Sequence, residues 1–143
     1  MQIKFWGVRG SIASGSPTTA GVGGNTTCVE VRCGDELIII DTGTGVRNLG
    51  MALMKEMPLK ATILFSHVHW DHIQGFPFFG PFFIPGNEFR VFGGTSLPTT
   101  IKEVLNQQMR PPYFPVKTDL FGSKITYHDV KPGQVIRGAK VTL

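Results

Sequence analysis

Cysteine is scarce in this chain of 143 residues, which contains only Cys28 and Cys33. Two cysteines five positions apart form neither a disulfide framework nor a zinc-binding motif. On one continuous strand their side chains would point to opposite faces of a sheet, so we expect each to fill a small apolar space. Cysteine chemistry therefore gives no indication of the function.

Long apolar runs and charged residues are also few. No stretch approaches the ~20 apolar residues that a membrane-spanning helix needs, and the N-terminus lacks the basic and then apolar segments of a secretory signal. We therefore expect a cytoplasmic protein with no membrane partner. With 17% charged and 41% hydrophobic residues the composition indicates a globular chain, and its length predicts a single domain over residues 1–143.

Apolar patterning predicts both strands and helices. Alternating or continuous apolar residues predict strands at 2–6, 26–32, 36–41, 61–65, 88–92, 123–130 and 134–143. The second and third of these runs are separated by a Gly-Asp turn, which predicts a β-hairpin. Apolar residues at helical spacing predict an amphipathic helix over residues 44–57 and a second helix over residues 95–108, with Pro98 near its start.

Three further segments are irregular. Residues 7–25 form a long loop rich in Gly, Ser and Thr, and loops of this length are usually functional or mobile. Residues 73–85 interleave five phenylalanines with three prolines. Because exposing so many aromatic rings would be costly, we expect this segment to be a pocket wall or a locally packed flap, in preference to a partner surface. The proline-rich residues 111–116 are expected to be rigid and extended.

The strongest functional signal is a cluster of histidines. His67, His69 and His72 lie within six consecutive positions together with Asp71. Imidazole nitrogens and carboxylate oxygens bind zinc and similar divalent ions at about 2.0–2.2 Å. Residues two apart in an extended segment point the same way, so His67 and His69 can reach one metal, while Asp71 and His72 can reach a second where the chain turns. The motif follows an apolar strand, a typical place for sites in α/β architectures.

Two other residues are notable for their position. Asp41 ends a second buried run and is followed by Thr-Gly-Thr-Gly, so it can cap a helix or support a metal ligand, and the two roles are compatible. His128 stands far from the other three histidines, and we expect it to be structural or exposed and not a ligand.

The order of these elements, with His67-x-His69-x-Asp71-His72 after a strand, resembles the metallo-β-lactamase superfamily. Residues 5–11 (Phe-Trp-Gly-Val-Arg-Gly-Ser), 23–26 (Gly-Gly-Asn-Thr) and 111–115 (Pro-Pro-Tyr-Phe-Pro) look like the branch related to cyclic phosphoribosyl phosphodiesterases and tRNA 3′-processing nucleases. The resemblance implies an α/β (α+β) fold, the αββα sandwich. This chain would form about its N-terminal half, a mixed sheet with helices on one face.

The resemblance also implies a hydrolase that uses two divalent metal ions. His67 and His69 would bind the first ion, and Asp71 and His72 the second, with Asp71 as the candidate catalytic residue. Zinc is the first expectation, and manganese or iron suit the same ligands. A bridging water with a lowered pKa would attack the substrate.

The resemblance adds roles for two residues outside the motif and a class of substrate. Asp41 would orient a histidine ligand. Arg9, in the glycine-rich loop, would contact an anionic substrate, toward which the net charge of +4 also leans, although such a charge is equally ordinary for solubility. The expected substrate is a small-molecule or nucleotide-like phosphodiester.

The sequence departs from the family pattern after His72. The full fold has a further histidine, a bridging aspartate and a final histidine, and no convincing counterpart follows His72 here. Each metal would keep two protein ligands, fewer than the three or four that hold zinc firmly. We therefore expect an incomplete enzyme, completed by a missing C-terminal half or by a homodimer. The alternatives are a non-catalytic metal-binding or interaction half-domain and a hydrolase of carboxyl or thioester substrates.

Overall fold

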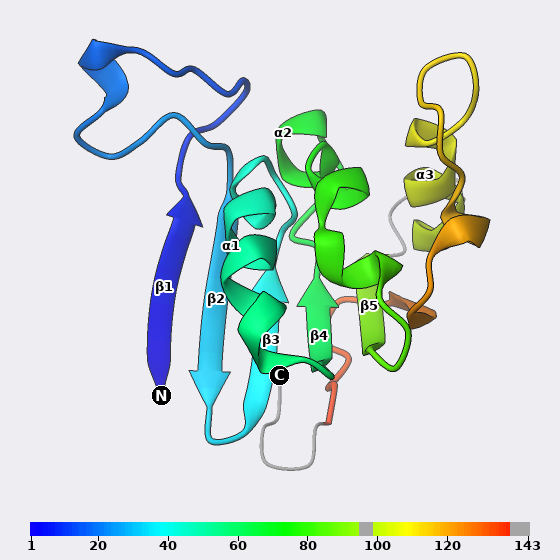
Figure 1. Cartoon of the computed structure of the whole chain (residues 1–143). Helices are drawn as coiled ribbons and strands as arrows, with labels where there is room; N and C mark the ends of the chain where they lie inside the picture. The colour runs from blue at the N-terminus through cyan, green and yellow to red at the C-terminus, as the bar shows by residue number, and fades with distance from the viewer. Residues whose placement is uncertain (95–98, 138–143) are drawn as a thin grey trace.

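Six strands form one mixed sheet in the computed structural model, which describes residues 1–94 and 99–137 (Figure 1). The strands lie in the sheet in the order in which they occur in the chain. They are β1 Gln2–Gly7, β2 Cys28–Cys33, β3 Glu36–Ile40, β4 Lys60–Leu64, β5 Glu88–Gly94 and β6 Lys124–Val130. Each of the first six predicted strands is confirmed to within two residues at either end, and the predicted strand 134–143 falls largely outside the described residues.

The direction of the strands changes at β3. The β1–β2 and β2–β3 pairs are antiparallel, which confirms the predicted hairpin, and Gly34 takes the positive φ of 59° that its turn requires. The β3–β4, β4–β5 and β5–β6 pairs are parallel. Parallel neighbours need crossover connections, and right-handed crossovers place the connecting segments on one face of the sheet. The carboxyl ends of β3, β4 and β5 therefore lie along the same edge.

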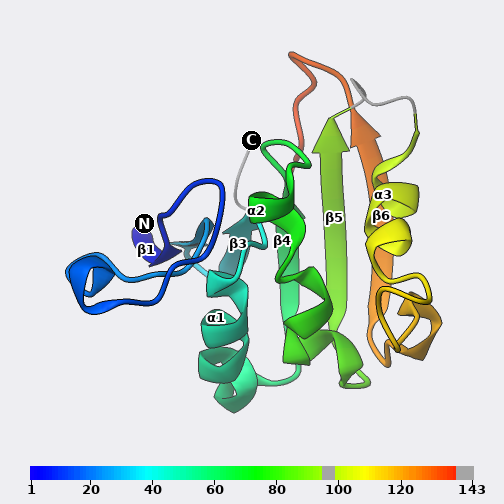
Figure 2. The ribbon, with the colours of Figure 1, turned by 90° about the horizontal axis from the view of Figure 1, so that it is seen from above.

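Three α-helices cover that face: α1 Gly45–Leu53, α2 Trp70–Ile73 and α3 Ile101–Gln108 (Figures 1 and 2). Short 3-10 helices lie between them or flank them: η1 Pro17–Thr19, η2 Met54–Glu56, η3 Phe76–Phe78, η4 Gly80–Phe83 and η5 Thr118–Leu120. The predicted sheet with helices on one face is confirmed. No helix among residues 1–94 and 99–137 is long and apolar enough to span a bilayer.

The core lies between the sheet and these helices. Alternate strand residues point into it, and the buried set from the four inner strands is Cys28, Leu37, Ile39, Ala61, Ile63, Phe89 and Val91. From the helices it receives Val46, Leu49, Leu53, Ile101 and Leu105. Both cysteines are free thiols, as expected, and burial raises the pKa of Cys28, which keeps that side chain a neutral filler.

The phenylalanine-rich segment 73–85 contributes more to this core than its composition suggested. Phe76, Phe79 and Phe82 are fully buried, and their rings pack against one another with centroids 4.6 Å and 4.9 Å apart. Phe82 also contacts the ring of Phe89 on β5, edge to face at 5.0 Å. The segment is therefore a packed flap over β5 and α1, and the partner-surface alternative is wrong for these three residues.

The two longer helices differ in detail from their predictions. The first ends as an α-helix at Leu53 and continues as η2, and its face carries Met51 into solvent, with 61% of that residue exposed. The second begins at Ile101, because Thr100 caps it and Glu103 completes a capping box. Pro98 lies outside the described residues. The start of the segment at 111–113 forms a turn, so the predicted extended conformation is wrong there.

The other face of the sheet is also apolar. Ile38, Ile40, Leu64 and Phe92 point to it in adjacent register positions, and β1 adds Ile3 and Phe5, which are largely exposed. His128 on β6 lies on this face, exposed, with its ring stacked on Phe92 at 4.7 Å. The expectation that His128 is not a metal ligand stays a prediction.

Truncating Phe82 should show how much the aromatic packing stabilises the fold. Phe82→Ala removes a fully buried ring at the junction of η4 and β5, and we expect the free energy of unfolding to fall by about 3–5 kcal/mol. Phe5→Ala is the matched control, since Phe5 is largely exposed on β1 and its loss should change the stability by less than about 1 kcal/mol. Urea unfolding measures the free energy of unfolding of both variants. Equal losses of stability would contradict the assignment of Phe82 to the core.

A second prediction concerns Tyr127, which packs partly buried against the core from β6. Burial raises the pKa of Tyr127 to about 12 from the ordinary value of 10.0. Between these pH values the unfolded chain loses the phenol proton while the folded protein keeps it, so the free energy of unfolding should fall as the pH rises from about 10 to about 12. In urea unfolding, Tyr127→Phe should reduce this fall in the free energy of unfolding with pH. An unchanged pH dependence in the variant would contradict a raised pKa of Tyr127.

Candidate metal centre

The histidine motif lies at the carboxyl end of β4, beside the carboxyl end of β3. Asp41 directly follows β3, and its backbone N–H donates to the carbonyl of Leu64 at 2.8 Å, which extends the parallel pairing by one residue. After β4 the chain passes through Ser66 and His67 and enters α2, whose N-cap is His69. Parallel pairing thus brings Asp41 and the motif to the same edge of the sheet.

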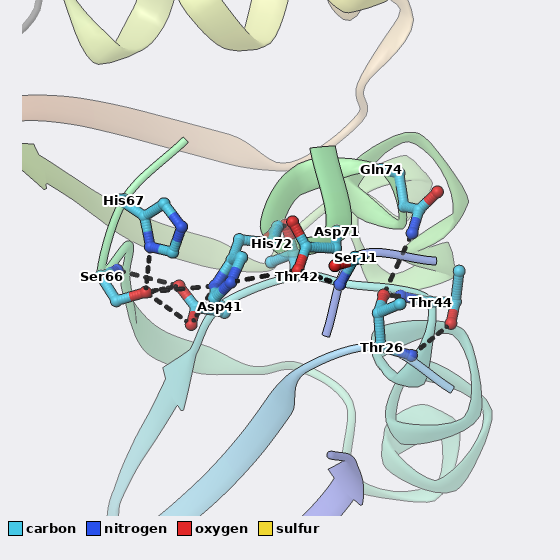
Figure 3. A network of polar contacts seen from close by, with 10 residues as sticks. All are labelled: Ser11, Thr26, Asp41, Thr42, Thr44, Ser66, His67, Asp71, His72 and Gln74. Carbon is cyan, nitrogen blue, oxygen red and sulfur yellow. Dashed lines mark hydrogen bonds and ion pairs between the residues drawn. The ribbon is translucent and has the colours of Figure 1, made fainter. Parts of the chain in front are cut away.

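Asp41 is the acceptor at the centre of the site. Its side chain is buried, and its backbone takes a positive φ of 60°. One carboxylate oxygen accepts the Ser66 backbone N–H at 2.8 Å, and the other lies 2.8 Å from Nδ1 of His72 (Figure 3). The Ser66 hydroxyl contacts both oxygens, at 3.0 Å and 2.8 Å. The N-cap of α1 is Thr44, so Asp41 supports the motif and does not cap this helix.

These contacts assign the tautomers of two histidines. A carboxylate can only accept, so His72 must donate from Nδ1 and keeps a lone pair on Nε2. The hydroxyl of Ser66 gives its single proton to Asp41, so its 3.2 Å contact with Nδ1 of His67 makes that ring the donor as well. Both imidazoles therefore keep Nε2 free for a metal ion, which is the arrangement that metal-binding histidines usually have.

The three imidazole rings lie close together. The ring centroids of His67 and His72 are 3.9 Å apart, and those of His67 and His69 are 4.6 Å apart. His67 and His69 are exposed, whereas the side chain of His72 is 17% exposed. The sequence prediction that these side chains gather at one strand end agrees with this geometry.

Asp71 joins the cluster through the glycine-rich loop. Its Oδ2 atom accepts the Ser11 backbone N–H at 2.8 Å and lies 3.5 Å from Nε2 of His72. Ser11 has a positive φ of 66°, so the loop turns sharply where it meets the motif. The Ser11 N–H, together with the nearby His72 and His67, holds the pKa of Asp71 below its ordinary value, so the carboxylate is kept in the ionised form that a metal requires.

Close backbone packing holds α2 in place. The N–H of Thr42 donates to the carbonyl of His72, and the N–H of Gly75 donates to the carbonyl of Thr42, both at 2.8 Å. A Cβ atom on Gly75 would lie 2.1 Å from the carbonyl oxygen of Gly43, so the contact requires glycine. The Thr-Gly-Thr-Gly run after Asp41 thus packs directly against α2 and holds it through backbone hydrogen bonds. From the sequence this run could be predicted only as a turn.

A network of polar contacts connects this run and the residue after α2 with the end of the glycine-rich loop. The Thr44 N–H donates to the Thr26 hydroxyl at 2.8 Å, and the Thr26 N–H donates to the Thr44 hydroxyl at 2.9 Å. Gln74, just after α2, donates to the same Thr26 hydroxyl at 3.2 Å (Figure 3). Arg9 pairs through its backbone with Thr26, and its Nε is buried without a hydrogen-bond partner among the described residues.

The donor chemistry suits a divalent metal, and the set is incomplete. Imidazole nitrogens and an ionised carboxylate are zinc ligands, and Asp41 and Ser66 prepare two of the rings to bind. Within residues 1–94 and 99–137, however, no group of three or more His, Cys, Asp or Glu side chains is arranged to hold an ion. The described chain therefore has suitable donor types at this edge without three of them arranged around one point, and the assignment of two ligands to each metal stays a prediction.

Comparisons with known proteins find a family similar in sequence and solved structures similar in fold. The family described as "Metallo-beta-lactamase superfamily" matches residues 21–85, the part of the chain that contains Asp41 and the whole histidine motif. A search of curated proteins found no significant match.

Three solved structures resemble the chain over nearly its full length. The metallo-β-lactamase fold protein YhfI from Bacillus subtilis is 16% identical with a TM-score of 0.62, and the match covers 98% of this chain and 49% of that one. The short form of human tRNase Z is 20% identical with a TM-score of 0.57, over 92% of this chain and 46% of that one. A diphosphatase of the PhnP family is 17% identical with a TM-score of 0.56, over 94% of this chain and 52% of that one. At these identities the likeness shows the fold alone. The chain spans about half the length of each structure.

Replacing Asp41 should test whether it prepares His72 for a metal. Asp41→Asn keeps the shape of the side chain and removes the charge that holds the Nδ1 proton, so zinc affinity should fall by about 10–100-fold in isothermal titration calorimetry. Asp119→Asn, at an exposed position in η5, is the matched control and should bind zinc like the unchanged chain. Equal affinity of the Asp41→Asn variant and the control would contradict the role given to Asp41.

Proposed function

Because residues 21–85 belong to the metallo-β-lactamase superfamily and the sheet has its fold, we propose that this chain provides the first half of the site of a metal-dependent phosphodiesterase. The observation that carries the proposal is the set of three imidazoles and Asp71 at the ends of β3 and β4, with Asp41 directing His72. With Nδ1 of His72 and of His67 engaged by Asp41 and Ser66, Nε2 is the nitrogen of each ring that would bind a metal, and Nε2 of His72 lies 3.5 Å from the other candidate ligand, Asp71.

The residues divide into metal ligands and residues that position them. His67 and His69 would hold one ion, and Asp71 and His72 a second, with zinc favoured by the imidazole-rich set and manganese or iron also suited. The bound ions would supply a water of lowered pKa and polarise the scissile group. Asp71, as a ligand facing the reacting atoms, is the candidate catalytic residue. The carboxylate of Asp41 would keep His72 in one tautomer and orientation.

Three features favour a phosphodiester over a carboxyl or thioester substrate. The net charge of +4 attracts anions to the chain. Arg9 lies two residues before Ser11, whose backbone N–H contacts Asp71, so its guanidinium is the cation nearest in sequence to the candidate site and would meet an anionic group there. Two of the similar structures are named as a tRNase and a diphosphatase, enzymes that cleave bonds to phosphorus.

The remaining ligands would come from a second half. The described chain offers no group of three metal-binding side chains, and it spans about half of the similar structures. The apolar face that carries Ile40, Leu64 and Phe92 is the surface on which a second sheet could pack, either from further chain or from a second copy. The alternative function is a non-catalytic metal-binding half-domain, which the missing third ligand favours.

Metal content and hydrolysis, measured on the same samples, test this function. Zinc per chain is determined by mass spectrometry of the metal, the oligomeric state by sedimentation, and hydrolysis with bis(4-nitrophenyl) phosphate. We expect zinc-dependent hydrolysis in an assembled species and little or none in the monomer. His67→Ala should lower zinc affinity and hydrolysis by at least about 100-fold, whereas Asp119→Asn, at an exposed position in η5, should leave both unchanged.

The possible results separate the alternatives. Zinc binding that depends on His67 without hydrolysis in any assembled species would favour the non-catalytic half-domain. Hydrolysis of a thioester or a β-lactam in preference to the phosphodiester would replace the proposed chemistry. Zinc binding that His67→Ala does not alter would remove the motif from the site.

A further inference from the structure

An apolar groove adjoins the histidine motif. It has a volume of about 630 Å³ and lies between the segment that follows the first two motif histidines and the segment formed by α3 and the turn after it. Val68 and Trp70, which alternate with His67, His69 and Asp71 in the sequence, form part of one wall. Tyr113 and Phe114, which follow α3, line the groove as well. The groove and the candidate metal ligands therefore share the segment from His67 to Asp71.

Aromatic side chains in this groove are unusually exposed. Trp70 is 82% exposed, Tyr113 is 84% exposed and Phe78 is 55% exposed. Phe78 is held edge-on against Phe114, with ring centroids 5.5 Å apart, and the buried Ile73 closes the groove from below. Large aromatic rings gathered beside a site, when neighbouring phenylalanines of the same segment are fully buried, mark a binding surface.

The lining is neutral throughout, with glutamine as its polar component. It contains no charged side chain among the described residues, so it is unsuited to the phosphate group itself. Gln74, Gln107 and Gln108 supply amides, and Nε2 of Gln108 is buried without a hydrogen-bond partner among the described residues. The amides that line the groove can donate to and accept from the polar edge of a ligand.

We propose that this groove binds a planar aromatic or heteroaromatic ring in the organic part of the substrate, while the phosphate lies at His67 and His72. The proposal rests on the phosphodiesterase function and names the substrate class for the same site. A ring stacks on Trp70 or Tyr113 and places its polar edge toward the glutamine amides. The volume is within the ~300–1,000 Å³ range of small-molecule pockets, and only a ligand that extends from the motif would occupy both places.

Fluorescence can test the groove without any metal chemistry. The chain has two tryptophans, Trp6 and Trp70, so Trp6→Phe leaves Trp70 as the sole emitter. In the presence of a metal chelator, adenosine 5′-monophosphate should quench the Trp70 emission in a saturable manner. Ribose 5-phosphate, which lacks the ring, should not. The Trp70→Phe variant, in which only Trp6 emits, should show no saturable quenching.

A second variant tests the part of the lining that follows α3. Tyr113→Ala should weaken the binding of adenosine 5′-monophosphate by about 5–10-fold, the loss of one stacking partner. Phe5→Ala, which removes an exposed ring on β1 far from the groove in the sheet order, is the matched control and should bind normally. Circular dichroism confirms that each variant is folded. Competition by phenyl phosphate separates the two kinds of ring. If phenyl phosphate displaces adenosine 5′-monophosphate, the groove binds aromatic rings in general; if it does not, the groove binds a heteroaromatic base.

Several results would overturn the proposal. They are the absence of saturable quenching, equal quenching by ribose 5-phosphate, and equal affinities of the Tyr113→Ala and Phe5→Ala variants. A blue shift of Trp70 emission with rising protein concentration and no ligand would assign the groove to a contact between copies of the chain. Since these measurements use no metal, quenching without hydrolysis in any assembled species would reject the phosphodiesterase function alone, and hydrolysis without quenching would reject the groove alone.

Discussion

The carboxylate of Asp41 is the contact on which the site depends. It lies at the end of β3 and accepts hydrogen bonds from Ser66, just after β4, and from His72 in α2. One buried acid thereby connects two strands and a helix, and it determines which ring nitrogen of His72 carries the proton. Because a buried carboxylate must be satisfied by donors, the same requirement that stabilises this edge of the sheet also fixes the orientation of a histidine that is a candidate metal ligand.

The sheet itself has two apolar faces that are treated differently. The helices and the buried phenylalanines cover one face, and Ile40, Leu64 and Phe92 lie on the other. An incomplete set of metal ligands and an apolar second face have the same explanation if a second sheet completes both. Under the proposed function one added layer would serve both, because the candidate ligands lie at the carboxyl ends of the strands whose second face it would cover.

Local patterning was sufficient for much of this molecule. Six strands, the hairpin, the approximate positions of two helices and the grouping of three histidines with Asp71 all follow from the spacing of apolar residues and from residue types. Composition was a poorer guide to burial. The phenylalanine-rich segment was expected to be a pocket wall or a packed flap, but its composition could not tell that Phe76, Phe79 and Phe82 are core residues while Phe78 is exposed, because neighbours distant in sequence decide which side of a segment is covered.

The sequence by itself determined the ligand types, their spacing and the strand that delivers them, since these are properties of a short continuous segment. Only the tertiary structure brought Ser11 to Asp71 across 60 residues and assigned Asp41 to His72 and not to a helix cap. It likewise brought Tyr113 and Trp70 into the lining of one groove. These pairings depend on how crossover connections return the chain to the same edge of the sheet, and no local pattern encodes that distance.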